Sequence, residues 1–176
     1  MNGWFAAALF AAVTPASAGL LDDQLDRLLR LHAPDSLRAF RVAEARDLVG
    51  NWEDHRGAYR AQADFDGDGS DDQAALLVRR KGPGFRLIVV LSVRSEKPVV
   101  LVLEDQSWAA QGFGLDVAPP GSYKTARGKG YSVGASDPAQ IELSLPAINR
   151  YHFESQNGFW FWDRGAKKFR FVQMSD

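Results

Sequence analysis

The chain has 176 residues, no cysteine and a formal net charge of −1 at pH 7. This charge balance has no basic excess, which argues against nucleic acid or an anionic membrane as the main partner. The lack of cysteine excludes disulfides, a thiol nucleophile and lipid attachment through an N-terminal cysteine. A chain of this length can bury a sufficient core without such cross-links.

The N-terminal segment has the pattern of a signal peptide. An apolar run over residues 4–13, too short to cross a bilayer, precedes the small residues of Pro15-Ala16-Ser17-Ala18. We therefore predict a signal peptide over residues 1–18, a mature domain over residues 19–176, and a periplasmic or secreted location without membrane insertion after cleavage. Met1-Asn2-Gly3 lacks the usual Lys or Arg, so a buried N-terminal helix remains the alternative.

Helical spacing follows this segment. Leucines recur over residues 20–32, acidic residues come early and basic residues late, and Pro34 closes the element. A second, shorter helical stretch is predicted over residues 35–48, ending near Gly50.

The rest of the mature chain has the pattern of a β-sheet protein. Apolar residues that alternate or run continuously predict strands over residues 58–65, 73–80, 85–93, 99–104, 140–145, 148–154, 158–162 and 168–174. Residues 105–138 are rich in Gly and Pro and predict only short extended pieces and turns. The fold class is therefore α+β and mainly β: one domain in which N-terminal helices pack on a largely antiparallel sheet, with a meander at its C-terminal end.

Residues 64–72 read Asp-Phe-Asp-Gly-Asp-Gly-Ser-Asp-Asp. Oxygen donors stand at alternating positions of this loop, which suits Ca²⁺ because that ion takes six to eight oxygens at about 2.3–2.6 Å. The predicted donors are the carboxylates at positions 1, 3, 5 and 9 and a backbone carbonyl at position 7, from Asp64, Asp66, Asp68, Asp72 and Ser70. Asp71 is predicted to be a non-ligand, and Gly69 permits the sharp turn.

The flanks of this loop separate it from an EF-hand. An EF-hand needs a bidentate Glu at position 12, where this chain has Ala75, and period-2 alternation on both sides indicates strands. Asp-Phe-Asp-Gly-Asp-Gly-x-x-Asp between two strands resembles the loop of the FG-GAP (integrin α-chain-like) repeat, over about residues 58–80. The resemblance implies a structural calcium ion at the tip of a β-hairpin. An acidic, solvated loop without an ion is the alternative.

Candidate catalytic groups are few. The histidines are His32, His55 and His152, and no serine stands in a recognisable nucleophile context. Glu142 and Glu154 lie in predicted strands, where a glycosidase-like carboxylate pair competes with the more ordinary interpretation of an exposed strand face. We therefore expect no enzymatic activity.

Four consecutive aromatic residues, Phe159-Trp160-Phe161-Trp162, place two rings on each face of one predicted strand. One interpretation is a central strand covered on both faces. The other is a contact surface for a partner formed by Trp160 and Trp162 and widened by Tyr151.

These features predict an exported, non-enzymatic, calcium-binding domain that recognises a protein or an envelope component. One alternative is a periplasmic inhibitor or immunity protein against a cell-wall hydrolase. Another is a polysaccharide-active enzyme whose aromatic side chains stack on sugar rings.

Overall fold

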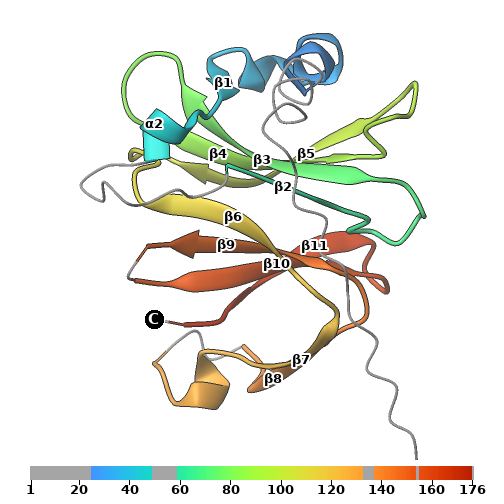
Figure 1. The fold of residues 1–176 in the computed structure, drawn as a ribbon, viewed down its shortest axis with the longest axis vertical. Helices are drawn as coiled ribbons and strands as arrows, with labels where there is room; N and C mark the ends of the chain where they lie inside the picture. Colours follow the sequence, from blue (N-terminus) through green and yellow to red (C-terminus); the bar gives the residue numbers. More distant parts are fainter. Residues whose placement is uncertain (1–24, 49–58, 133–136, 154, 176) are drawn as a thin grey trace, which may run out of the picture.

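The computed structural model describes residues 25–48, 59–132, 137–153 and 155–175 (Figure 1). The predicted signal peptide, its cleavage site and His55 lie outside these residues. In the described part of the chain, no helix is both long enough and apolar enough to span a membrane.

The first sheet is antiparallel and has β3 (Asp72–Arg79) and β4 (Phe85–Leu91) at its centre. Strand β5 (Val99–Gln106) pairs with the far edge of β4. Two short strands pair with the edge of β3 that faces away from β4. Strand β1 (Phe40–Val42) pairs with the C-terminal part of β3, and β2 (Arg60–Ala63) pairs with its N-terminal part. The positions of β2, β3, β4 and β5 agree with the strands predicted from the apolar pattern, whereas β1 was not predicted to be a strand.

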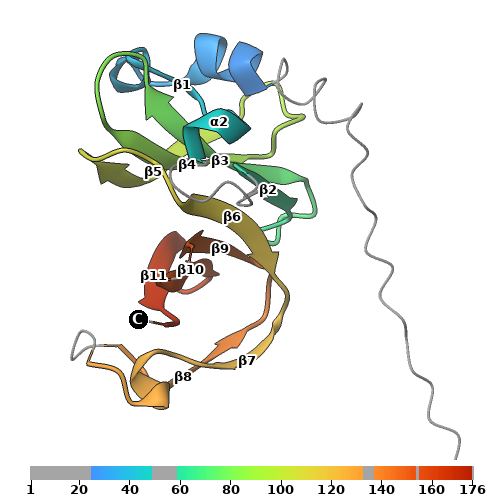
Figure 2. The ribbon, with the colours of Figure 1, turned by 60° about the vertical axis from the view of Figure 1, so that its left-hand side comes forward.

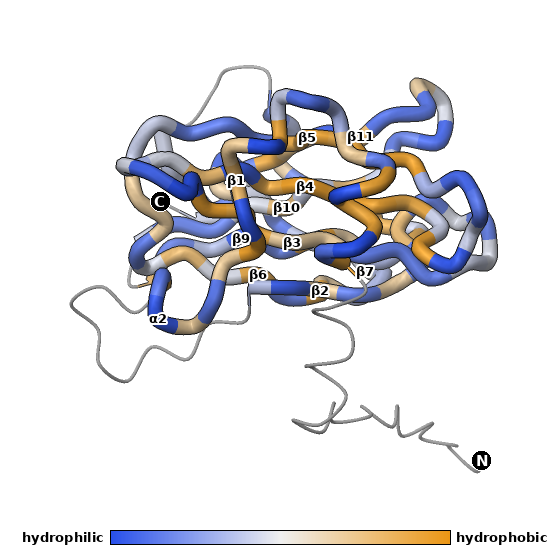
Figure 3. The backbone as a smooth tube through the Cα atoms, turned by 90° about the horizontal axis from the view of Figure 1, so that it is seen from above, coloured by the Kyte–Doolittle hydropathy of each residue, from blue (hydrophilic) through white to orange (hydrophobic). Residues whose placement is uncertain are grey.

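The two central strands are buried on both faces, which explains their nearly continuous apolar sequence. Alternate residues of β3 and β4 belong to different hydrophobic clusters, one on each side of the sheet. Figure 3 shows hydrophobic residues concentrated along β3, β4 and β5 and hydrophilic residues in the turns at both ends.

A helix over residues 25–32 covers the outer face of the first sheet, as predicted. The helix predicted over residues 35–48 is wrong. That stretch forms the 3₁₀ turn η1 (Asp35–Leu37), strand β1 and the short helix α2 (Ala45–Leu48). Residues 40–42 form a strand and not a helix because they pair with the free edge of β3. This pairing satisfies the backbone hydrogen-bonding groups of β1 and buries its alternate side chains.

The second sheet has the strand order β11-β10-β9-β6 and is also antiparallel. Its strands are β6 (Phe113–Ala118), β9 (Ala147–His152), β10 (Asn157–Asp163) and β11 (Lys168–Gln173). The last three form a meander, as predicted, but the strand predicted at its start, over residues 140–145, pairs elsewhere. Strand β6 comes from the stretch for which only short extended pieces were predicted.

The layers stack in a simple order. From top to bottom in Figures 1 and 2, the order is helix 25–32, the first sheet, the second sheet and a two-stranded hairpin. This hairpin pairs β7 (Gly121–Lys124) with β8 (Gln140–Leu143), and the 3₁₀ turn η2 (Arg127–Lys129) lies between them in sequence. The described residues are therefore mainly antiparallel β-sheet with a few short helices.

Candidate metal centre

The acidic loop lies at the tip of the hairpin formed by β2 and β3. The register pairs Ala63 with Asp72, so residues 64–71 form the connection. Gly67 and Gly69 have φ values of +80° and +85°, a region that glycine adopts without the steric cost of a side chain. These two glycines let the chain fold back over its own carboxylates.

Three carboxylates converge inside this loop. One oxygen each from Asp64, Asp66 and Asp72 lies within 4.8 Å of the other two. None of the three forms an ion pair with any residue that the structure describes. The oxygen-only donor set suits a hard cation such as Ca²⁺ or Mg²⁺, whereas Zn²⁺ sites usually include nitrogen or sulfur ligands.

Backbone amides of the loop hold Asp64 and Asp66 in place. The Asp64 carboxylate accepts hydrogen bonds from the amides of Gly67 and Gly69 at 2.7 and 2.9 Å. Asp66 Oδ1 accepts one from the Asp68 amide at 3.1 Å. Burial raises the pKa of Asp66, and the negative charges of Asp68 and Asp64 raise it further. The charged form of Asp66 is therefore disfavoured by its acidic neighbours in the loop.

Asp72 is the innermost of the three carboxylates and has no exposed surface. Its Oδ2 accepts a hydrogen bond from the Phe65 amide at 2.8 Å, and its Oδ1 accepts one from the Ser92 amide, also at 2.8 Å. Burial nevertheless raises the pKa of Asp72 to about 6. The backbone amides stabilise the charged form only in part, and a bound cation would supply the remaining stabilisation.

The other two predicted ligands are placed differently. The Asp68 carboxylate is not part of the three-carboxylate cluster. Its oxygens accept hydrogen bonds from the Ser70 amide and the Ser92 hydroxyl, both at 2.7 Å. These bonds lower the pKa of Asp68. The Ser70 carbonyl remains a predicted ligand. Asp71, predicted to be a non-ligand, lies 3.4 Å from the Arg94 guanidinium.

Two neighbouring segments support the loop and were not predicted from the sequence. The first is the turn between β4 and β5, where Ser92 donates to both Asp68 and Asp72 and has a φ of +51°. The second support comes from two turns next to strands of the other sheet, because a Cβ built on Gly67 would stand 3.0 Å from Arg164 Nη2 and 3.1 Å from the methyl carbons of Leu145. Nothing local in the sequence marks these contacts, since they join residues far apart in the chain.

The register of the second sheet divides the aromatic residues predicted to bind a partner. Trp160 packs against the core between the two sheets, with its ring 5.2 Å from that of Phe171, and Trp162 pairs with Phe169 at the same distance. Phe161 belongs to the cluster under the β7–β8 hairpin. Strand β10 thus packs against other residues on both faces, with Trp160, Phe161 and Trp162 partly buried. Tyr151 lies on the face opposite Trp160, because the residue paired with Trp160 on β9 is Ile148, so the predicted residues do not form one continuous surface.

The histidines and glutamates considered for catalysis are scattered. His32 is exposed at the end of its helix, and the His152 ring packs edge-on to Phe113 at 4.8 Å. Glu142 is exposed on β8 and accepts a hydrogen bond from Gln140. Glu154 lies outside the described residues.

Comparison with protein-family models, with curated proteins and with solved structures gives no match to this chain.

Proposed function

We propose that the chain is an exported, non-enzymatic, calcium-binding domain that recognises a protein or an envelope component. The observation that carries the proposal is the convergence of the Asp64, Asp66 and Asp72 carboxylates at a hairpin tip. Three negative charges within a few ångströms, one of them fully buried, are costly without a cation among them.

The ion is Ca²⁺ in this proposal. Mg²⁺ demands near-ideal octahedral geometry and usually retains several waters, whereas Ca²⁺ accepts the larger and more flexible set of oxygens that an acidic loop offers. The Asp68 carboxylate and the Ser70 carbonyl complete the ligand set. For Asp68 this role is compatible with its bond to Ser92, because a carboxylate accepts several partners at once.

The ion acts structurally in this proposal. The loop is connected through Asp72 to the β4–β5 turn and through Gly67 to Leu145 and Arg164, in turns next to strands of the second sheet. A cation that pulls the carboxylates together would therefore stabilise both connections. Because it binds the folded state, it would add about 2.7 kcal/mol at a hundredfold excess over its Kd.

Calorimetric titration of chelator-treated protein tests this role, with thermal melts in calcium and in chelator alongside. We expect one calcium site, much weaker binding of Mg²⁺ and a higher melting temperature with calcium. Equal affinity for both ions would reduce the loop to an acidic cluster. Measurable binding with no change in melting temperature would instead contradict the structural role.

Export and partner recognition are tested separately. Mass spectrometry of the exported protein should give an N-terminus at Gly19. Support for a partner comes from exposed apolar side chains along β5 and beyond its end, where Val99, Val102 and Trp108 are 51%, 41% and 53% exposed. Pull-down from envelope extract with the mature protein and with Trp108→Ser should recover one specific component with the former only. Identical recovery with both proteins would remove this surface from the proposal.

A further inference from the structure

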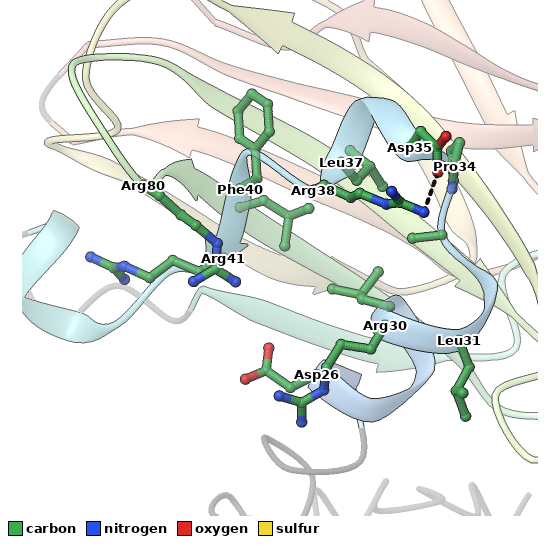
Figure 4. Close-up of a pocket in the computed structure, with 13 residues that line it drawn as sticks. Asp26, Arg30, Leu31, Pro34, Asp35, Leu37, Arg38, Phe40, Arg41 and Arg80 are labelled. Carbon is green, nitrogen blue, oxygen red and sulfur yellow. Dashed lines mark ion pairs between the residues drawn. The ribbon is translucent and has the colours of Figure 1, made fainter.

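A cavity lined by both apolar and charged side chains lies away from the acidic loop, on the outer face of the first sheet (Figure 4). It has a volume of about 510 Å³ and opens between helix 25–32, the turn η1, strand β1 and the end of β3. This volume falls in the range of small-molecule sites, which is about 300–1,000 Å³.

The floor of this cavity is apolar and held in place. Leu37, Phe40 and Leu77 line it and are each 5% exposed or less. The Phe40 ring has the guanidinium of Arg86 above it, 4.4 Å from the ring centroid. Arg86 also donates to the Ser36 carbonyl at 2.7 Å, which anchors η1 beside the sheet. The floor is therefore a preformed apolar surface.

The rim is basic. Four arginines and two aspartates line the cavity, which gives these side chains a formal charge of +2; they are Arg30, Arg38, Arg41, Arg80, Asp26 and Asp35. Two of the arginines are already neutralised, since Arg38 lies 2.8 Å from Asp35 and Arg41 lies 2.7 Å from Asp47. Arg30 and Arg80 form no ion pair with any described residue. They approach from two different elements, the helix and the end of β3 (Figure 4).

We propose that this cavity binds a small organic anion with an apolar chain. Its carboxylate or sulfonate lies between the guanidinium groups of Arg30 and Arg80, and its chain lies along Leu37, Phe40 and Leu77. Charge complementarity selects the anion, because two unpaired guanidinium groups face a site with only one unpaired carboxylate, that of Asp26. The apolar floor and the 66% exposed Leu31 at the rim select the chain. The proposal is independent of the calcium loop.

Three single-chain ligands of equal length separate charge from apolar burial: decanoate, decanol and decyltrimethylammonium. Each is titrated below its micelle concentration into the full chain in calcium buffer, with backbone amide shifts as the readout. We expect decanoate to bind at least about tenfold more tightly than either of the others, with the largest shifts in helix 25–32 and β1. Equal binding of all three, or acetate binding as well as decanoate, would overturn the proposal.

Variants of the two unpaired arginines locate the anion. Arg30→Gln and Arg80→Gln remove charge at exposed positions and should each weaken decanoate binding about three- to tenfold, with unchanged melting temperature. Arg170→Gln, on the exposed side of β11, is the matched control and should bind decanoate like the wild type. Unchanged affinity in both cavity variants would refute the site. Binding to anionic phospholipid vesicles without binding to free decanoate would also refute it, and would indicate a membrane-surface role.

Discussion

Glu104 on β5 and Arg150 on β9 form an ion pair that joins the two sheets, with an N–O distance of 3.3 Å. Their side chains are only 10% and 9% exposed, and the Arg150 guanidinium also lies near the rings of Phe113 and Phe171. Burial lowers the pKa of Arg150, while the carboxylate of Glu104 acts in the opposite direction. The core between the sheets thus contains a charged pair whose members depend on each other.

Removing one member of this pair is expected to destabilise the fold strongly. Arg150→Met leaves the buried Glu104 carboxylate without a charged partner, with only the hydrogen bond from Gln106, and should cost about 3 kcal/mol or more of unfolding free energy. Adding Glu104→Leu should recover much of that loss, because no buried charge remains. Denaturant unfolding measures the free energy of unfolding of the wild type, of Arg150→Met and of the double variant. Arg170→Met, which breaks the exposed pair with Asp163, is the control and should change little. An Arg150→Met variant as stable as that control would contradict the prediction.

Neutralising Asp66 should have opposite effects with and without calcium. The pKa of Asp66 is raised in the folded protein, so the ionised form destabilises the metal-free fold at pH 7. Asp66→Asn removes that penalty and should raise the melting temperature in chelator. In calcium it removes a charged ligand and should lower both the affinity and the melting temperature. Asp71→Asn, outside the cluster, should change neither value appreciably. Parallel shifts in both buffers would show that Asp66 is not a ligand.

Two glycines of the loop separate backbone strain from packing. Gly67 and Gly69 have nearly the same positive φ, but a Cβ on Gly67 would contact Leu145 and Arg164, whereas a Cβ on Gly69 would meet nothing within 4 Å. Gly69→Ala should therefore cost only the left-handed strain, about 1 kcal/mol. Gly67→Ala should cost more, because the Leu145 and Arg164 side chains beside the second sheet must also move aside. Equal losses in denaturant unfolding would mean that the loop tip does not pack against that sheet.

The Arg41–Asp47 pair predicts a pH dependence. The two guanidinium nitrogens Nη1 and Nη2 of Arg41 each donate a hydrogen bond of 2.7 Å to one carboxylate oxygen of Asp47. This contact holds the pKa of Asp47 below its usual value. A lowered carboxyl pKa contributes stability above the unfolded value of about 3.9 and loses it as the pH falls through the folded value. Asp47→Asn should therefore be less stable than the wild type at pH 7, and the gap should close below about pH 4. Asp35→Asn, in the exposed pair with Arg38, is the control and should differ little in stability from the wild type at any pH. A stability difference for Asp47→Asn that does not change with pH would exclude the carboxylate charge as its cause.

Much of the sheet could be predicted because each strand carries its own apolar pattern. The failures needed information from elsewhere in the chain. Residues 35–48 have enough helical spacing to suggest a helix, but the open edge of β3 pairs with Phe40–Val42 instead. Strand β6 alternates apolar residues, yet Gly114 within it and Gly112 just before it are typical turn residues, and only its pairing with β9 defines it as a strand.

The same limit applies to the candidate site. Spacing selected Asp64, Asp66 and Asp72, which the structure brings together, because donor positions within one loop are set by local geometry; it also selected Asp68, which is not in the cluster. The contact between Ser92 and Asp72 could not be predicted from the sequence, since it spans 20 residues and depends on how β3 pairs with β4. The separation of Tyr151 from Trp160 likewise follows from the register between β9 and β10 and not from the identity of the residues.

Strand β3 has opposite charge at its two ends. It begins at Asp72 beside the five carboxylates of residues 64–72 and ends at Arg79, which Arg80 and Lys81 follow. The charges along this strand thus form a local dipole within a molecule of almost no net charge. Near an anionic surface the dipole would turn the arginine end inward and the acidic loop toward bulk solvent. An ion bound in the loop would reduce this dipole, so the concentration of free divalent cations would influence which end of the domain faces a charged neighbour.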